Sequence, residues 1–308
     1  MNFLVILEKV GAVLLLILIG YIFGRVAKPS EQARGLLATL VLNIAVPASI
    51  LAGVNDADFD AIRSDMLILI IASVCITLAT LLLSFPLSRL LEPRDRRSRA
   101  VIQATMYFHN YGFLGWPVCY MLLGAKGLLY AVLFSMPLNI MLYGFTPLLL
   151  GRTEPVARRF DKRMLLNVPF YATAAALGLL IGRVHLPEFI SSLLTMLGAL
   201  QTPLSMMIIG MILASARFAD VMRGIKVYGY SAIRLALLPL LAFAALKALG
   251  MSGLLLSVPV LITAMPAAAM SVVLVQRSGL DSVYASRLVV VSTLISVISI
   301  PLMALLVV

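Results

Sequence analysis

Charged residues divide this chain into long apolar stretches. Eight stretches contain no Asp, Glu, Lys or Arg: residues 35–55, 66–88, 100–125, 127–151, 164–182, 189–216, 248–276 and 288–308. Each is close to or above the ~20 residues that a helix needs to cross ~30 Å of hydrocarbon. Two more stretches, residues 4–26 and 227–247, are apolar apart from a few charges. The pattern predicts an all-α integral membrane protein with ten transmembrane helices, the first a retained span and not a signal peptide.

Composition and the distribution of charge also indicate a membrane protein. Hydrophobic residues make up 62% of the 308 residues and charged residues 12%, about half the charged share of a soluble domain. Most Lys and Arg lie in the connections after the odd-numbered spans, residues 25–34, 89–99, 152–163, 217–226 and 277–287. Basic connections face the cytoplasm, so we expect a multi-pass protein of the inner (plasma) membrane with both termini outside. The net charge of +11 is then a topology signal, and nucleic-acid binding is not expected.

The two halves of the chain resemble each other weakly. The first span ends in "IGYIFGRVAKP" and the sixth in "LGLLIGRVHLP", and the span after each has a central proline, Pro47 or Pro203. These matches favour two five-helix repeats, residues 1–152 and 164–308, joined by a cytoplasmic linker at residues 153–163. Because five is odd, the second repeat must be inverted relative to the first. Inverted repeats with interrupted helices are typical of secondary transporters.

Helix-breaking residues occur in the fourth span of each half. The first half contains "HNYGFLGWP" at residues 109–117, and the ninth span of the chain is interrupted at Pro266. Proline and glycine leave backbone groups unpaired, which costs several kcal/mol each in lipid. Two breaks that cross near the midplane would satisfy each other and direct two helix N-termini at one place, which favours an anion. Asn110 could add amide hydrogen bonds there; the alternative is a pair of kinks that only shape packing.

Five segments, in the same order, resemble the auxin efflux carrier family, which includes plant exporters and bacterial malonate and malate permease-like proteins. They are "LVLNIAVPASIL" at 40–51, "NYGFLGWP" at 110–117, "QTPLSMMIIGMILA" at 201–214, "TAMPAAAMSVVL" at 263–274 and "ASRLVVVSTLISVISIPL" at 285–302. The resemblance extends over nearly the whole chain. It implies a fold like that of the bile-acid/sodium symporters, with a scaffold, a mobile core that contains both crossing helices, elevator-type movement and a homodimer.

The resemblance also implies the residues of a substrate site. By position, Asn110 and Asn139 contact a carboxylate substrate, and Ser49 lines the scaffold side. Pro117 and Pro266 mark the two breaks. The crossover comprises residues next to them, Tyr111, Gly112, Gly115 and Met265.

The chain departs from the family pattern after Pro266, where an asparagine is common. Here Ala267, Ala268, Ala269 and Met270 precede Ser271. Ser271 is the remaining polar contact that we expect, so this half of the site is less polar than usual.

Two further polar residues lie within the spans. His109 adjoins Asn110 and is grouped with it in the substrate site. It either titrates during transport, since histidine changes charge near neutral pH, or is a neutral hydrogen-bonded residue of the bundle. Arg234 lies roughly 12 Å deep in its span, and no acidic residue of the uncharged spans can pair with it. It either attracts an anion, caps carbonyls of a broken helix or extends to the inner interface.

These features predict a secondary transporter that moves a small organic anion, a carboxylate, by alternating access around Asn110 and Pro266. The alternative is a proton- or sodium-coupled dicarboxylate importer on the same fold, although neither crossing helix contains Asp or Glu. An enzyme is not expected, because the spans lack a nucleophile with a base. We expect no cofactor and no metal site, since metal sites need three or four ligands. The expected partners are the substrate anion, the lipid bilayer and a second copy of the chain.

Overall fold

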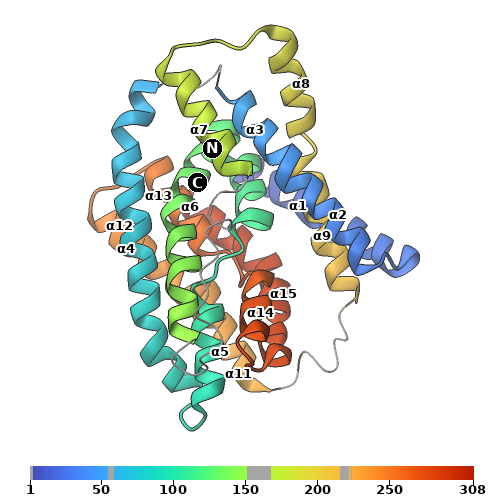
Figure 1. The fold of residues 1–308 in the computed structure, drawn as a ribbon, viewed down its shortest axis with the longest axis vertical. Helices are drawn as coiled ribbons and strands as arrows, with labels where there is room; N and C mark the ends of the chain where they lie inside the picture. Colours follow the sequence, from blue (N-terminus) through green and yellow to red (C-terminus); the bar gives the residue numbers. More distant parts are fainter. Residues whose placement is uncertain (1–2, 55–58, 151–167, 216–221, 223) are drawn as a thin grey trace.

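The structure is a computed structural model and describes residues 3–54, 59–150, 168–215, 222 and 224–308 (Figure 1). Within its helices, the side chains of residues 3–7, 9–10, 59–61 and 139–150 are not described. All regular elements of the described part are helices, as the sequence predicts. The predicted cytoplasmic linker, residues 153–163, lies outside the described residues.

The first helix group combines segments from both halves of the chain. It consists of α1 (Phe3–Ala27), α2 (Glu31–Leu40), α3 (Val46–Ala52), α7 (Val168–Ile181), α8 (Glu188–Gly198) and α9 (Gln201–Ser215), with a π-helical turn η1 (Val41–Ala45) between α2 and α3. α1 packs along α9, and α3 packs against both α7 and α8. In Figure 1, α1, α2, α3, α8 and α9 lie together along one side of the molecule.

The second helix group contains both interrupted spans. It consists of α4 (Phe59–Leu91), α5 (Arg96–Tyr107), η2 (Tyr111–Gly115), α6 (Trp116–Leu150), α11 (Ile225–Ala232), η5 (Ile233–Leu237), α12 (Leu238–Ala248), α13 (Leu254–Thr263), α14 (Ala269–Arg277) and α15 (Ser282–Val307). α4 packs against α5 and α6, and α15 packs against α11, α13 and α14. α6 turns sharply at Gly124 (φ 71°, ψ −167°). Glycine accepts this positive φ without strain, and the turn lies where the predicted fourth and fifth spans meet.

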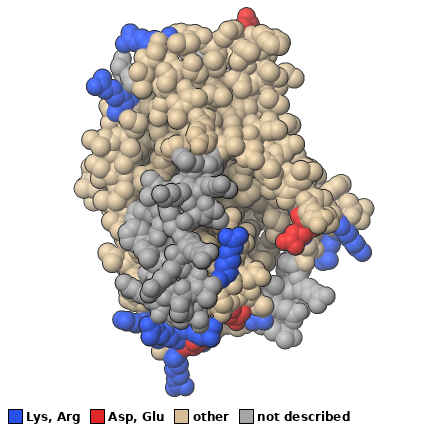
Figure 2. Space-filling model, viewed as in Figure 1, with Lys and Arg blue, Asp and Glu red and all other residues tan. Residues whose placement is uncertain are grey.

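The helices follow the predicted spans, but not all are long enough to cross a membrane alone. Six stretches of the described part are apolar and long enough to cross one: Glu31–Ala52, Ile62–Leu91, Tyr111–Leu138, Glu188–Ser215, Ile225–Ala248 and Ser282–Val307. Three more apolar stretches, Gly11–Ala27, Val168–Ile181 and Leu254–Thr263, are shorter. Figure 2 shows most Lys and Arg of one face in its lower part, with a wide uncharged belt above them. The count of ten spans and their inverted repeat stay predictions.

Three prolines of the described part follow π-helical turns. Pro47, Pro117 and Pro239 each occupy the second position of an α-helix, directly after η1, η2 and η5. A proline within a helix lacks an N–H, and its ring clashes with the carbonyl of the preceding turn. A π turn contains one residue more than an α turn, which moves the ring away from that carbonyl. The helices therefore continue past these prolines.

α1 and α9 approach closely because glycines face the opposite backbone. A Cβ atom on Gly20 would lie 2.2 Å from the Met207 carbonyl oxygen, and one on Gly210 would lie 2.1 Å from the Ile17 carbonyl oxygen. Small residues let membrane helices meet backbone to backbone, where van der Waals packing drives their association. The first helix group therefore depends on these glycines.

Asp95 begins α5, the helix that leads into the first break. Its carboxylate accepts hydrogen bonds from the Arg97 N–H (2.9 Å) and the Ser98 hydroxyl (2.6 Å). These bonds, above all the one from Ser98, hold the pKa of the Asp95 carboxyl below its ordinary value of 3.8. An N-cap of this kind typically stabilises a helix by about 1 kcal/mol.

We expect Gly210→Leu to lower the thermal midpoint of the detergent-purified protein, because the new side chain would overlap the backbone of α1. Overpacking of this kind costs about 1–3 kcal/mol or more. Gly178→Leu in α7 is the matched control, since a Cβ atom on exposed Gly178 would have no other atom within 4 Å. Equal midpoints for the two variants in differential scanning fluorimetry would contradict the close packing of α1 on α9.

Asp95→Ala should lower the thermal midpoint at neutral pH, and Asp95→Asn, which can still cap α5, should lower it less. Because folding lowers the pKa of Asp95, its carboxylate stabilises α5 above the ordinary pKa of 3.8. That effect is lost as the pH falls through the lowered pKa. The gap in midpoint between wild type and Asp95→Ala should therefore narrow in acid. A gap that widens instead would show that Asp95 does not cap α5.

Candidate functional site

The two interrupted spans cross and pair with each other. The first break separates α5 from η2, and the second separates α13 from α14. The Asn110 N–H donates to the Pro266 carbonyl (2.9 Å), and the Ala268 N–H donates to the Phe108 carbonyl (3.0 Å). These two bonds form an isolated antiparallel bridge. Each break thereby satisfies backbone groups of the other, as lipid requires.

Of the residues that the sequence assigns to the first break, Asn110 lies in it and Pro117 does not. This break comprises residues 108–110, and Pro117 lies in the first turn of α6, directly after η2. The π-helical turn accommodates the proline, so the helix does not end there. The second break comprises residues 264–268 and does include Pro266, as predicted.

The other predicted crossover residues adjoin the two breaks. Tyr111, Gly112 and Gly115 form part of η2, and Met265 precedes the proline of the second break. Gly115 lets η2 approach α13, since a Cβ atom on it would lie 2.7 Å from Ile262 Cδ1 and 3.3 Å from Met265 Cγ. Close packing thus holds the two broken helices side by side.

Arg234 joins both breaks from within the second helix group. It lies in η5 and is fully buried. Its Nη1 donates to the Thr263 carbonyl at the end of α13 (2.9 Å), and its Nη2 donates to Nδ1 of His109. Of the alternatives that the sequence leaves open, the structure shows capping of a broken helix. Extension to the interface is wrong, because none of the side chain is exposed.

The contact with Arg234 fixes the protonation of His109. A guanidinium has donors only, so Nδ1 of His109 must be unprotonated to accept its hydrogen bond. The hydrogen-bond network therefore assigns His109 as neutral, with its proton on Nε2. Its side chain is buried, with 1% of its surface exposed. Of the two alternatives for His109, a titrating residue or a neutral hydrogen-bonded one, this geometry matches the second.

A pocket opens beside the crossover, between the two helix groups. It encloses about 990 Å³, including the space at its mouth. η1 and α7 of the first group form one side; the first break, η2 and the start of α14 form the other. Much of the lining is apolar and includes Leu42, Phe113, Pro169, Met270 and Val273. Two side-chain amides, Asn43 and Asn110, also line it.

Two helix N-termini begin at this pocket. η2, which continues into α6, starts directly after Asn110, and α14 starts at Ala269. The first N–H groups of a helix have no acceptor within it, and Gly112, Phe113, Ala269 and Met270 at these two starts line the pocket. Both helix dipoles are therefore positive toward the same space, which favours a negatively charged group.

Asn110 has separate backbone and side-chain functions at the crossover. Its N–H bonds the second break, and its carbonyl accepts from the N–H groups of Leu114 (3.2 Å) and Gly115 (3.0 Å). Its side chain makes no capping hydrogen bond to η2. The amide belongs to a half-buried residue that lines the pocket.

Two of the other predicted substrate contacts, Ser49 and Ser271, are not among the described residues that line the pocket. Ser49 donates to the Gly198 carbonyl (3.0 Å) and so joins α3 to α8. Ser271 is fully buried in α14 and donates to the Ala268 carbonyl (2.6 Å). Asn139 lies in α6, among the residues whose side chains are not described. Contact of these three residues with a substrate stays a prediction.

Sequence reasoning does not identify two polar residues at the site. Asn43 lies in η1, is exposed and lines the pocket. A polar amide within an uncharged span is itself an indication of a functional site, so Asn43 could have been predicted from the sequence. Ser292 of α15 accepts a hydrogen bond from the Ala267 N–H (3.4 Å). No such signal distinguishes Ser292, because hydroxyl side chains are common in these spans.

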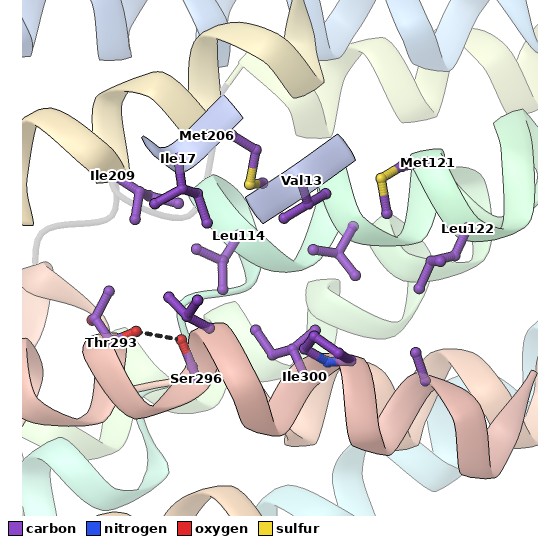
Figure 3. A pocket seen from close by; sticks show the side chains of 14 residues that line it. Val13, Ile17, Leu114, Met121, Leu122, Met206, Ile209, Thr293, Ser296 and Ile300 are labelled. Carbon is purple, nitrogen blue, oxygen red and sulfur yellow. Dashed lines mark hydrogen bonds between the residues drawn. The ribbon is translucent and has the colours of Figure 1, made fainter. Parts of the chain in front are cut away.

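A second cavity lies between the helix groups, where α1 and α9 face α6 and α15 (Figure 3). Its volume is about 450 Å³ when the space open to its surroundings is counted, and it is lined mainly by apolar side chains such as Val13, Leu122 and Met206. Its hydroxyl groups come from Thr293 and Ser296, and the Ser296 hydroxyl donates to the Thr293 carbonyl (2.7 Å). An apolar lining does not stabilise an anion. The pocket beside the crossover is therefore the candidate site.

Comparison with known proteins identifies the family of this chain. The family of membrane transport proteins matches residues 5–304. An uncharacterized transporter of Methanothermobacter thermautotrophicus is 31% identical over 299 residues, which cover 96% of this chain and 96% of that protein. These matches confirm the resemblance found in the sequence. With its apolar helices, the chain is a multi-pass membrane transporter, and it belongs to the auxin efflux carrier family of membrane transport proteins.

Proposed function

We propose that this transporter carries a small organic anion, a carboxylate, and binds it in the pocket beside the crossover. The observation that carries the proposal is that two helix N-termini begin at one pocket. A partly buried helix N-terminus favours an anion by up to about 2 kcal/mol, and here two act together. Asn110 and Asn43 supply amide donors, and the apolar lining suits the hydrocarbon part of an organic acid.

The position of the pocket between the helix groups supports alternating access. In the proposed fold, ten spans form two inverted repeats in the inner membrane, with both termini outside. The first helix group is the scaffold, and the second group is the core that moves in an elevator-like cycle. Two copies of the chain associate through the scaffold. Movement of one group along the other would expose a pocket at their boundary to each side of the membrane in turn.

A proton- or sodium-coupled dicarboxylate importer on the same fold is the second candidate. In transporters with broken helices, unwound carbonyls can coordinate the coupling ion. Here the carbonyls of Phe108, Pro266 and Thr263 each accept a hydrogen bond from the protein. His109 is held neutral by Arg234 and is therefore a poor proton carrier. For these reasons we rank the coupled importer second.

Asn110→Ala should raise the KM for saturable uptake about 10- to 100-fold, because hydrogen bonds to charged groups contribute about 1.5–3 kcal/mol. Asn110→Asp should reduce uptake further, since its carboxylate repels the anion at nearly unchanged volume. Uptake of radiolabelled malonate, malate and indole-3-acetate is measured in proteoliposomes under an imposed membrane potential.

Thr39→Val is the control for both Asn110 variants. Thr39 lies exposed on α2, and its hydroxyl bonds its own helix at the Gly35 carbonyl (2.8 Å). Its uptake should equal that of the wild type. The proposal fails if none of the three acids shows saturable uptake. If uptake is saturable but unchanged in both Asn110 variants, the site lies elsewhere.

Asn43→Ala should also raise the KM, by about 3- to 10-fold if the amide makes one neutral hydrogen bond of about 1 kcal/mol. Asn43 belongs to the first helix group and Asn110 to the second, so a substrate held by both would bridge the boundary. The same uptake assay applies, and the double variant tests whether the two amides act on one ligand. An unchanged KM for Asn43→Ala would remove the first helix group from substrate binding.

A further inference from the structure

Arg234 is a fully buried cation without a carboxylate partner in the described part of the chain. Its hydrogen bonds go to a backbone carbonyl and a neutral imidazole. Neither partner has a negative charge, so the positive charge of the guanidinium is not cancelled locally. A guanidinium does not lose its proton in proteins, and buried charges act over longer distances than exposed ones. The crossover therefore contains one fixed positive charge.

The contacts of Arg234 tie this charge to the pocket. Nη1 holds Thr263, the last residue before the second break, and Nη2 holds His109 of the first break. Asn110 directly follows His109 and lines the anion pocket. The guanidinium thus lies behind the crossover, bonded to both segments that form the pocket. The guanidinium must move together with these two segments in any movement that keeps these hydrogen bonds.

We propose that Arg234 is a fixed counter-cation for the anion bound at the crossover, and that the two charges traverse the membrane field together. This inference rests on the proposed function. With a monovalent anion bound, the moving charges cancel; without it, the core carries one positive charge. The membrane potential then acts on the return of the empty carrier and not on the loaded step.

The expected size of the effect is large enough to measure. One elementary charge that crosses the full field at about 100 mV shifts an equilibrium roughly fiftyfold. A barrier midway across the field would change a rate roughly sevenfold. Removal of the positive charge in Arg234→Gln should also weaken binding of the anion by about tenfold.

Equilibrium exchange and net efflux separate the two steps, because exchange uses only the loaded carrier. Both are followed in proteoliposomes with radiolabelled indole-3-acetate and malate, at zero potential and at about 100 mV set by potassium and valinomycin. For wild type, we expect exchange of monovalent indole-3-acetate to change less than about twofold and net efflux to change severalfold. In Arg234→Gln, exchange should become dependent on potential and the empty return should lose that dependence.

Further variants and the second acid extend the test. Arg234→Lys retains the charge, so its exchange should stay independent of potential even if it is slower. Arg25→Gln, an exposed arginine at the end of α1, is the control and should match wild type. With divalent malate bound, the net moving charge is −1 in the wild type and −2 in Arg234→Gln. Malate exchange should therefore depend more steeply on potential in Arg234→Gln than in the wild type.

The outcomes distinguish this inference from the proposed function. Equal voltage dependence of exchange and net efflux of indole-3-acetate in wild type would overturn the role of Arg234, whether or not Arg234→Gln folds. Equal dependence of exchange in wild type and Arg234→Gln, with either acid, would do the same. In both cases transport itself would stand. If neither acid shows saturable exchange, the proposed function fails and this inference fails with it.

Discussion

Backbone groups that lie inside a membrane must be hydrogen-bonded within the protein, and the crossover is where this requirement shapes the molecule most. Two segments leave the helical conformation at the same place and bond each other's backbone. Arg234 caps the carbonyl of Thr263, and Ser292 accepts from the N–H of Ala267. Because an unsatisfied group costs several kcal/mol in lipid, these contacts allow the breaks to exist. The helix N-termini and the pocket follow from the breaks.

Packing within the first helix group differs from packing at the boundary between the two groups. Within the first group, Gly20 and Gly210 bring α1 and α9 into backbone contact. Between the groups lie the pocket beside the crossover, the apolar cavity and a long hydrogen bond from the Thr202 hydroxyl to the Pro117 carbonyl (3.3 Å). The two cavities at this boundary fit the rigid-body movement proposed above. The groups also meet closely there, since a Cβ atom on Gly53 would lie 2.8 Å from Ala125 Cβ.

Much of the fold could be predicted from the sequence, because hydrophobic length and helix-breaking residues are local properties. The positions of the apolar helices and the second break at Pro266 follow from them, whereas a substrate site beside Asn110 stays a prediction. Asn110 lies in the first break as predicted, but Pro117 does not mark it, since composition does not reveal that a π-helical turn can accommodate a proline. The partners of Arg234, at positions 109 and 263, are distant in sequence, so only the three-dimensional structure identifies them. Some spans consist of two short helices, so the number of transmembrane spans cannot be counted from helix length alone. The inverted repeat is still a prediction.

In the proposed function, main-chain N–H groups would make much of the contact with the anion, and this affects how the protein can evolve. Substitution at Ala269 or Met270 alters a side chain that lines the pocket but retains the backbone N–H of that residue. A preference for negative charge that depends on backbone N–H groups would therefore persist through substitutions, whereas the shape and polarity of the accepted molecule would change one residue at a time. Related chains can diversify in substrate without having to reinvent charge recognition.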